Sequence, residues 1–406
     1  MVKKYLIKTY RSLDWQLIGI FSIFSLLLLC LYVFRISSLL PGFTAAEKSF
    51  INNASSLRTI FDNPLFAPHK ILQYIMIKLD HNGFLAMRMP SILLGTIVVG
   101  MFYTVLRRWF NVFISAITTL LFATNSFFIN NVRYSSPEVT ILIAVLLLAY
   151  GLWLNTKPSP RIALLAGVCI AALSLYTPGL IWFFMVFLVW QKDNLIHIFH
   201  KARPLFLLSV LIIILIVTPL LISLISTPET ITTYLGIPSQ LQNAVINLPK
   251  NLIIIPYNLF WHGSNSIELN LVGTPIFDIF ILAMFILGFY YFIIENKKRF
   301  SALTLTGILL VLIFIALNNS RYLVLLVPLV YIGVASGINE MLNKWYAKFP
   351  NNPIAKGLAY SLVIVAVASS CFYNLNKYYI AWPQTPATKK VFHIPPNPSQ
   401  KTININ

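Results

Sequence analysis

Apolar segments of about 20 residues, each long enough to cross the hydrocarbon core of a bilayer, recur along nearly the whole chain. Only 10% of the 406 residues are charged and 58% are hydrophobic, whereas soluble domains carry about 25% charged residues. The three cysteines lie inside apolar runs, where a thiol behaves as a small hydrophobic group. The sequence therefore predicts an integral membrane protein and gives no indication of redox chemistry.

The apolar segments predict an all-α polytopic fold with about eleven transmembrane helices. We expect a single membrane module over residues 1–375, with polar outer loops at 35–83 and 226–271, and a polar, proline-rich outer tail at 376–406 that is extended or disordered. Thr177-Pro178-Gly179 interrupts one long apolar run, which forms either two tilted helices or a re-entrant pair. The predicted spans are 17–34, 84–106, 112–130, 137–154, 161–176, 178–191, 204–225, 273–294, 300–317, 321–339 and 355–375.

The charges give the orientation. The chain has 30 Lys+Arg against 11 Asp+Glu, a net charge of +19, and most of the cations fall in alternate short breaks between the apolar runs. Short loops rich in Lys and Arg stay cytoplasmic, so we expect a multi-pass protein of the plasma membrane with a cytoplasmic N-terminus. No basic stripe is interleaved with polar surface, which disfavours binding to nucleic acid.

Two carboxylates on the predicted outer face are candidates for chemistry. Glu47 follows the first helix and begins an amphipathic segment, and Glu138 opens an apolar span directly after Pro137. Each has a simpler alternative: Glu47 is a solvated loop residue, or Glu138 complements the dipole of its helix. No metal site is predicted, because the pair His197 and His200 is on the inner side; a divalent cation at the two carboxylates is left open.

Basic residues gather at the same predicted face. Arg88 and Arg321 lie at the ends of apolar spans, and Arg133 lies in the short loop that precedes Glu138. A cation at such a position is costly unless it reaches the head groups or has an anionic partner. These residues suit either an anionic lipid phosphate close to a base or independent contacts with outer head groups.

Several fragments, taken in order, resemble one known family. They are PGFTAAEKSF, NPLFAPHKILQYI, AMRMPSILLG, RRWFN, ATNSFFINNVRYSSPEVTIL, GTPIFDIFILAMFILGFYYF and SRYLVLLVPLVYIGVASGI. Their order and spacing, from residue 11 to about 340, are similar to the GT-C membrane glycosyltransferases. The branch concerned includes the dolichyl-phosphate-mannose protein mannosyltransferases and the lipid A aminoarabinose transferase.

The resemblance implies a glycosyltransferase that moves a sugar from a polyprenyl-phosphate donor to a lipid, glycan or protein acceptor at the outer face. It implies inversion and a carboxylate general base, for which Glu47 is the first candidate and Glu138 the second. The implied contacts with the donor phosphate are Arg133, Arg88, Arg321, His69 and Lys70. The family usually has an Asp-Glu pair in the first outer loop, and its aspartate position is Ala46 here.

Two other functions stay open. In a lipid or solute transporter or flippase, Glu138, Arg88 and Arg321 would bind cargo along a path through the membrane. Alternatively, the missing aspartate at Ala46 is compatible with a catalytically weakened scaffold that descends from the enzyme.

Overall fold

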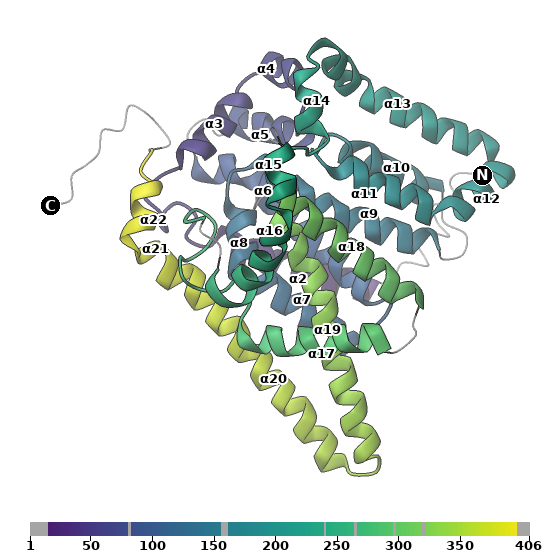
Figure 1. Cartoon of the computed structure of the whole chain (residues 1–406), viewed down its shortest axis with the longest axis vertical. Coiled ribbons are helices and arrows are strands. Elements are labelled where there is room, and N and C mark those ends of the chain that lie inside the picture. The colour runs from purple at the N-terminus through teal and green to yellow at the C-terminus, as the bar shows by residue number, and fades with distance from the viewer. Residues whose placement is uncertain are drawn as a thin grey trace.

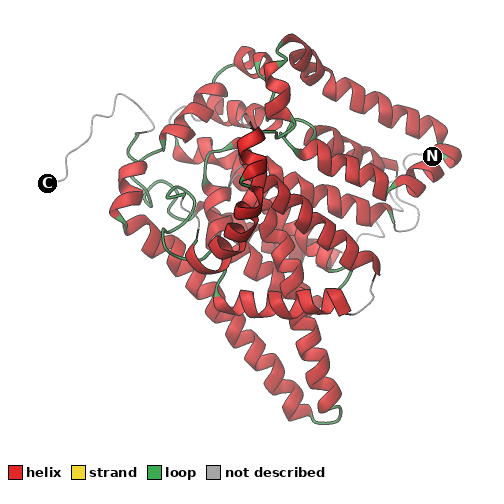
Figure 2. Cartoon of the chain, in the orientation of Figure 1, coloured by secondary structure: helices red, strands yellow, loops and turns green. Residues whose placement is uncertain are grey.

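The computed structural model describes residues 15–79, 83–155, 161–238, 241–263, 266–294, 298–318 and 322–395. Helices make up nearly all of this part of the chain (Figure 2). Its only β interaction is an isolated antiparallel bridge between Phe43 and Ile394, so no strand occurs within these ranges. The all-α fold expected from the sequence is confirmed.

The first half of the chain forms eleven α-helices and one 3-10 helix in the described ranges. They are α2 (Trp15–Val33), α3 (Ala45–Asn53), α4 (Leu57–Asp62), α5 (Ala67–Leu79), α6 (Phe84–Leu106), α7 (Val112–Thr124), α8 (Ser126–Arg133), η1 (Pro137–Leu142), α9 (Ile143–Leu154), α10 (Arg161–Ser174), α11 (Leu180–Trp190) and α12 (Lys192–Lys201).

The second half begins with a long helix and ends with short ones. It contains α13 (Arg203–Ser226), α14 (Glu229–Tyr234), α15 (Leu241–Ile246), α16 (Leu248–Tyr257), η2 (Asn258–His262), α17 (Ile279–Ile294), α18 (Lys298–Asn318), α19 (Leu323–Lys348), α20 (Pro353–Asn376), η4 (Lys377–Ala381), α21 (Trp382–Gln384) and α22 (Pro386–Val391).

Each predicted span contains a helix, but some bounds differ: α17 begins at Ile279 and not at 273, and α19 continues to Lys348 beyond the predicted end at 339. In the described ranges, five helices are long and apolar enough to cross a membrane, or six if the bent pair α7 and α8 is one span, and five more apolar helices are shorter. The pair α7 and α8 bends by 60° at Asn125. Gly179 separates α10 from α11 with a φ of 77°, a left-handed conformation that glycine adopts without strain. The multi-pass architecture is confirmed, and the count of eleven spans stays a prediction.

Helix α19 lies at the centre of the bundle, and 89% of its apolar 18-residue stretch is buried. In α13, only 11% of the corresponding stretch is buried. Helix α13 runs along one edge of the molecule, as Figure 1 shows. Its outward leucine and isoleucine side chains suit contact with lipid tails. The helix pair α19 and α20 extends beyond the rest of the bundle at the bottom of Figure 1.

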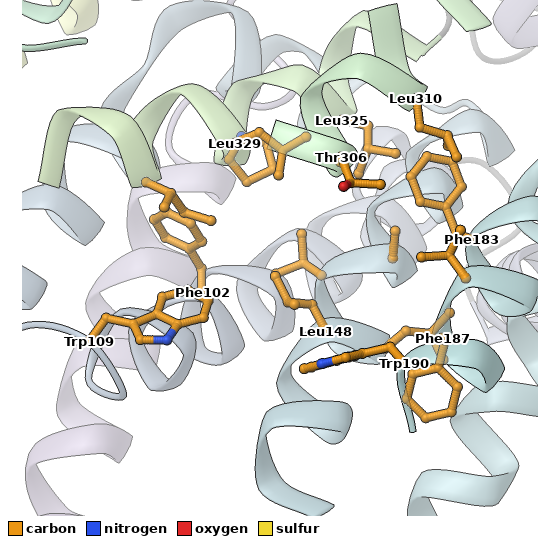
Figure 3. A pocket seen from close by; sticks show the side chains of 17 residues that line it. Phe102, Trp109, Leu148, Phe183, Phe187, Trp190, Thr306, Leu310, Leu325 and Leu329 are labelled. Carbon is orange, nitrogen blue, oxygen red and sulfur yellow. The ribbon is translucent and has the colours of Figure 1, made fainter. Parts of the chain in front are cut away.

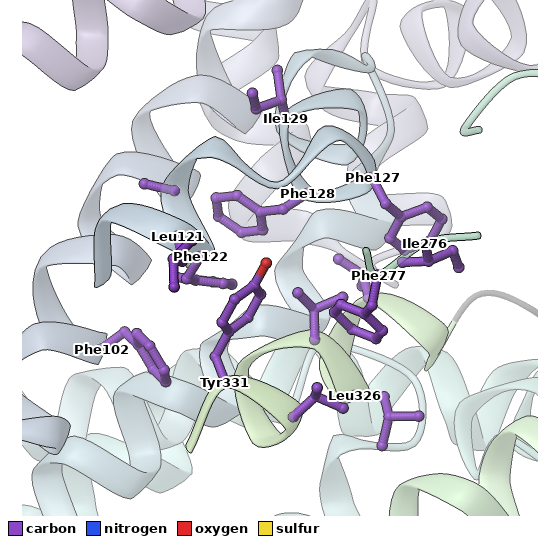
Figure 4. Packing of buried hydrophobic residues seen from close by; sticks show 14 of the residues in the cluster. Phe102, Leu121, Phe122, Phe127, Phe128, Ile129, Ile276, Phe277, Leu326 and Tyr331 are labelled. Carbon is purple, nitrogen blue, oxygen red and sulfur yellow. The ribbon is translucent and has the colours of Figure 1, made fainter. Parts of the chain in front are cut away.

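Glycines allow α17 and α19 to pack at close range. A Cβ atom at Gly288 would lie 1.9 Å from the Gly333 carbonyl oxygen, and one at Gly337 would lie 2.0 Å from the Met284 carbonyl oxygen. Small residues four apart bring membrane helices together in this way. An aromatic cluster around Tyr331 then ties α19 to α7 and to the segment before α17 (Figure 4), with the Tyr331 ring edge-on to Phe122 and Phe277.

The two polar loops form short helices instead of crossing the bundle. Residues 35–79 contain α3, α4 and α5, and the later loop contains α14, α15, α16 and η2. The chain after Asn376 differs from the expected extended tail, because it continues through η4, α21 and α22. Apolar contacts order this segment: Trp382 is buried against Tyr378 and Phe392, and the bridge from Ile394 to Phe43 joins it to the first loop.

Candidate functional site

Buried polar side chains gather where α3, α5 and α6 meet the segment between α8 and η1. We call this group the polar layer, and all of its side chains are buried. Its members come from parts of the chain up to 92 residues apart, from Thr44 to Ser136. They are Thr44, Glu47, His69, Lys70, Gln73, Arg88, Ser91, Ser135 and Ser136.

Glu47 is held at the centre of the polar layer. Thr44 caps α3: its hydroxyl accepts from the Glu47 amide, and the Glu47 carboxylate accepts from the Thr44 amide at 3.1 Å, which is a capping box. The Ser135 amide donates to the same carboxylate at 2.9 Å. The sequence left open that Glu47 is a solvated residue of the first outer loop. The structure excludes this alternative, because the Glu47 side chain is 0% exposed.

Arg88 completes the surroundings of Glu47. Its Nε and Nη2 atoms each donate to one Glu47 oxygen at 3.1 Å, a bidentate pair that joins α6 to α3. The guanidinium also lies over the rings of Phe43 and Phe84, with its carbon 5.0 and 5.6 Å from their centres. Four donors now occupy the roughly four lone-pair sites of the carboxylate. The carboxylate therefore has no acceptor position left for a substrate in this arrangement, whereas the Arg88 Nη1 group makes no hydrogen bond to the described residues.

His69 and Gln73 face α6 from α5. The His69 Nε2 atom lies 2.9 Å from the Ser91 hydroxyl, and the Gln73 amide donates to the Ser135 hydroxyl at 2.7 Å. Burial, with a smaller contribution from Lys70, lowers the pKa of His69 from 6.5 to about 3. The imidazole is therefore neutral at physiological pH. The His69 Nδ1 and Gln73 Oε1 atoms have no hydrogen-bond partner.

Lys70 forms no hydrogen bond or ion pair with Glu47 or Arg88 in the described ranges and instead bonds to the end of α4. Its ammonium group donates to the carbonyl of Asn63 at 2.7 Å, at the end of α4. Burial lowers the pKa of Lys70 from 10.5 to about 8, so the side chain stays charged at neutral pH. In this position Lys70 stabilises the end of α4.

Arg133 ends α8 and is 2% exposed. Its guanidinium carbon lies 5.2 Å from the ring centres of both Tyr378 and Tyr379. The Nε and Nη1 atoms have no hydrogen-bond partner, and the one salt bridge in the described ranges belongs to Arg88 and Glu47. Arg133 therefore keeps unused guanidinium donors and has no carboxylate partner in the described ranges, and Arg321 lies outside them.

Glu138 occupies the first turn of η1, after Pro137. The Ser136 hydroxyl accepts from its amide at 3.1 Å, and the Ser136 carbonyl accepts from Ser91 at 3.4 Å. These bonds place the start of η1 beside the His69 side of the polar layer. The Glu138 side chain is half-buried, so it is more accessible to a substrate than Glu47.

The described residues contain no cluster of three or more His, Cys, Asp or Glu side chains that could hold a metal ion. His197 lies on α12, a helix outside the polar layer. Because the four donors around Glu47 occupy its oxygens, this carboxylate does not fit a metal ligand in the present arrangement.

A large apolar cavity lies deeper in the bundle, between α6, α9, α11, α18 and α19 (Figure 3). It holds about 870 Å³ of empty space, open space included, and its walls include Phe102, Leu148, Phe183, Trp190 and Leu329. Thr306 supplies the hydroxyl seen at its edge in Figure 3. Such a lining suits a hydrocarbon chain and excludes polar or charged ligands.

Comparison with known proteins agrees with this architecture. The sequence profile of the family described as dolichyl-phosphate-mannose-protein mannosyltransferase matches residues 62–222. No curated protein sequence matches the chain. The crystal structure of ArnT from Cupriavidus metallidurans bound to undecaprenyl phosphate superposes with a TM-score of 0.54 and 13% sequence identity, over 94% of this chain and 78% of that chain.

The chain has the GT-C fold. ArnT in the apo state gives a similar result, with a TM-score of 0.50 and 14% identity over 93% of this chain and 77% of that one. The resemblance that the sequence indicated is thereby confirmed. The residues that the family profile matches include His69, Lys70, Arg88, Arg133 and Glu138.

The structure adds residues that the sequence did not single out. Tyr134 connects the Thr44 hydroxyl, at 2.6 Å, to Glu268 of the second loop, at 2.9 Å. Lys377, the C-cap of α20, is 5% exposed, although the sequence assigned it to the outer polar tail. A charge at the end of an apolar helix was the only signal for Lys377. Contacts between such distant segments have no periodicity that a single sequence displays.

Proposed function

We propose that this protein is an inverting membrane glycosyltransferase, which transfers a sugar from a polyprenyl-phosphate donor to a lipid, glycan or protein acceptor at the outer face of the plasma membrane. The observation that carries the proposal is the joint occurrence of a GT-C fold and a buried polar layer in a chain that is otherwise apolar. Buried polar groups in a membrane protein are expensive and indicate function. The apolar cavity supports a lipid-linked donor, because its lining fits an isoprenoid chain.

The geometry favours a division of roles between the two acidic candidates. Glu47 holds Arg88 and the start of α3, and its four donors leave no oxygen for an acceptor hydroxyl. A general base must come within hydrogen-bond reach of the proton that it removes. Glu138 meets this requirement better because it is half-buried. We therefore assign a positioning role to Glu47 and the role of base to Glu138.

Arg133 is the strongest candidate for contact with the departing lipid phosphate. Negative charge develops on that phosphate as the bond to the sugar breaks, and donors fixed in advance near it lower the barrier. The Arg133 Nε and Nη1 donors have no partner, whereas Arg88 is already bound to Glu47. Arg321, His69 and Lys70 remain candidates for the same contact.

One observation favours a second candidate function, a weakened member of the family that acts as a scaffold. The aspartate of the family's acidic pair is Ala46, and the remaining Glu47 is enclosed by its own hydrogen bonds. The site thus lacks one carboxylate, and Glu47 stabilises the fold around itself. Both features are compatible with a loss of activity.

Reconstitution distinguishes these functions. The purified protein in liposomes receives a polyprenyl-phosphate-linked sugar that carries a label, together with candidate acceptors from the cell envelope. Transfer that is lost in Glu138→Gln supports the proposed enzyme. Donor movement across the bilayer without transfer would point instead to a transporter, and neither transfer nor movement would favour the scaffold.

A further inference from the structure

An apolar crevice lies between α17, α19 and α20, near the turn that joins α19 to α20. We call it the Trp345 crevice. It holds about 590 Å³ of empty space, open space included, and it shares no wall residue with the apolar cavity of Figure 3. Its hydrophobic lining suits a hydrocarbon chain and disfavours a polar ligand. The wall residues are Phe280, Met341, Leu342, Trp345, Ala359, Leu362, Val363 and Ala366.

Side-chain contacts between α19 and α20 fix the walls of the Trp345 crevice. The Trp345 indole donates to the Ala355 carbonyl at 2.9 Å and so joins the two helices next to their turn. The rings of Tyr346 and Tyr360 lie 5.8 Å apart, and Tyr360 packs edge-on against Phe113 of α7. The crevice is therefore part of the packing of α19 on α20 and not a gap between two independent helices.

The turn beside the crevice is strongly basic. We call residues 344–356 the tip, and its three lysines, Lys344, Lys348 and Lys356, are all exposed. Glu340 is the last of the 11 acidic residues of the chain, so the tip contains none. Glu340 itself is only 8% exposed. No acidic residue of this segment therefore balances the positive charge of the tip.

Two lysines of the tip share helix faces with the walls of the crevice. Lys348 follows Trp345 by three positions, and residues three or four apart lie on the same side of a helix. On α20, Lys356 precedes Ala359 by three positions and Val363 by seven. Neither lysine forms an ion pair in the described ranges. Each helix thus continues from an apolar wall to a cation at the same end of the crevice.

The tip lies at the end of the molecule opposite to the polar layer. In Figure 1, the turn between α19 and α20 is at the bottom, whereas α3 and α5, which contribute Glu47 and His69 to the polar layer, are near the top. Short basic loops stay on the cytoplasmic side, so we expect the tip at the inner surface of the membrane. Ile354 and Leu358, which are 80% and 51% exposed, suit contact with lipid beside the lysines.

We propose that the Trp345 crevice binds an acyl chain of an anionic phospholipid from the cytoplasmic leaflet, with Lys348 and Lys356 beside its head group. A zwitterionic phospholipid has the same chains but no net charge. Each lysine near the membrane surface should favour the anionic lipid about fivefold. This site lies at the other end of the molecule from the polar layer, so it does not rest on the proposed function.

Titration with two lipids tests the role of the lysines. The full-length protein in detergent receives phosphatidylglycerol or phosphatidylcholine with the same acyl chains, and native mass spectrometry counts the bound lipids. We expect phosphatidylglycerol to bind more tightly. The double variant Lys348→Gln/Lys356→Gln should lower the affinity for phosphatidylglycerol roughly tenfold to thirtyfold and leave that for phosphatidylcholine unchanged. The matched control, Lys389→Gln/Lys390→Gln, changes two exposed lysines of α22 and should bind both lipids as the wild type does.

A second variant tests the crevice itself. Ala366 is half-buried in the wall, so Ala366→Leu fills part of the empty space without any change in charge. Its larger side chain should weaken binding of both lipids roughly threefold to tenfold, because it displaces part of the acyl chain. Ala368→Leu is the matched control, since Ala368 is exposed on α20 and does not line the crevice. That variant should leave binding of both lipids unchanged.

Each outcome supports or overturns the proposal. Loss of the preference for phosphatidylglycerol in the lysine variant, together with weaker binding of both lipids in Ala366→Leu, would support it. Equal affinity of the wild type for the two lipids, or an unchanged preference in the lysine variant, would show that the lysines do not select the lipid. Normal binding in Ala366→Leu would show that the acyl chain lies outside the crevice. Either of these last two results would make the proposal wrong, and neither would bear on sugar transfer.

Discussion

Glu47 and Arg88 form a buried bidentate pair in which each Glu47 oxygen accepts from Arg88 at 3.1 Å, and this pair fastens α3 to α6. The pair explains why two charged side chains can lie inside a largely apolar protein. Each charge balances the other, and the amides of Thr44 and Ser135 satisfy the remaining lone pairs of the carboxylate. It also makes the structural and chemical roles of Glu47 separable by experiment.

Removal of one member of the pair should destabilise the protein. Glu47→Gln keeps the shape of the side chain but leaves the Arg88 cation buried without a counter-charge, which costs about 3–5 kcal/mol. Arg88→Met should cost a similar amount. The double variant should lose much less than the sum of the two single variants. Thermal unfolding of the purified protein in detergent measures all three.

The same variants test Glu47 as a base. If Glu47 acts through position, sugar transfer and stability should fall together in Glu47→Gln. A base contributes roughly 10² to 10⁴ in rate without any contribution to stability. If Glu47→Gln lowers the rate of sugar transfer by that factor but keeps the melting temperature of the wild type, Glu47 and not Glu138 is the base.

Ala46→Asp restores the Asp-Glu pair that the resembling family usually has in its first outer loop. Ala46 lies in the first turn of α3 and is half-buried, and a carboxylate there is favourable to the helix dipole. We therefore expect the variant to fold as well as the wild type. In a weakened enzyme it should raise the rate of sugar transfer, measured with a labelled polyprenyl-phosphate donor. If neither the wild type nor Ala46→Asp transfers sugar, the result favours the scaffold.

Glu138→Gln should lower the turnover of the enzyme roughly 10² to 10⁴-fold, because a neutral amide cannot take the proton of the acceptor. Affinity for the donor should change little. Glu229→Gln is the matched control, since Glu229 also opens a helix but is exposed on α14. Full activity in Glu138→Gln would exclude this carboxylate as the base.

The membrane helices were predictable because their signal is local. An apolar run of sufficient length defines a span by itself, and the helices at Phe84–Leu106 and Pro137–Leu154 have the predicted bounds. The fate of the chain after Asn376 was not predictable in this way. Its polar, proline-rich composition is typical of an extended tail, and its order depends on the contact of Trp382 with Phe392 and the bridge from Ile394 to Phe43.

The candidate site was predictable only as a set of residue types. Sequence indicated that Glu47, Arg88 and Arg133 belong to one face, and the structure brings them close to Tyr378. Which cation pairs with which acid depends on tertiary geometry, because Glu47 is 41 residues from Arg88 along the chain. The sequence therefore listed Arg88 with Arg133 as phosphate contacts, whereas the structure pairs Arg88 with Glu47 and leaves Arg133 without a carboxylate partner in the described ranges.

His69 predicts a loss of stability in acid. Burial lowers its pKa to about 3, below the value of about 6.5 in an unfolded chain, so the unfolded state binds the proton first as pH falls. The free energy of unfolding should therefore be unaffected above pH 6.5 and should decrease by up to about 1.4 kcal/mol per pH unit between pH 6.5 and 3. His69→Gln should remove this part of the pH dependence, and His393→Gln, which changes an exposed histidine, should keep it.

The close packing of α17 on α19 gives a final test that does not depend on catalysis. A Cβ atom at Gly337 would lie 2.0 Å from the Met284 carbonyl oxygen, so Gly337→Ala must push the two helices apart and should destabilise the protein by about 1–3 kcal/mol. Gly357→Ala on α20 is the matched control, because no atom lies within 4 Å of its added Cβ. There alanine should stabilise the helix by up to about 1 kcal/mol. Thermal unfolding in detergent measures both changes, and equal melting temperatures for the two variants would contradict this packing of α17 and α19.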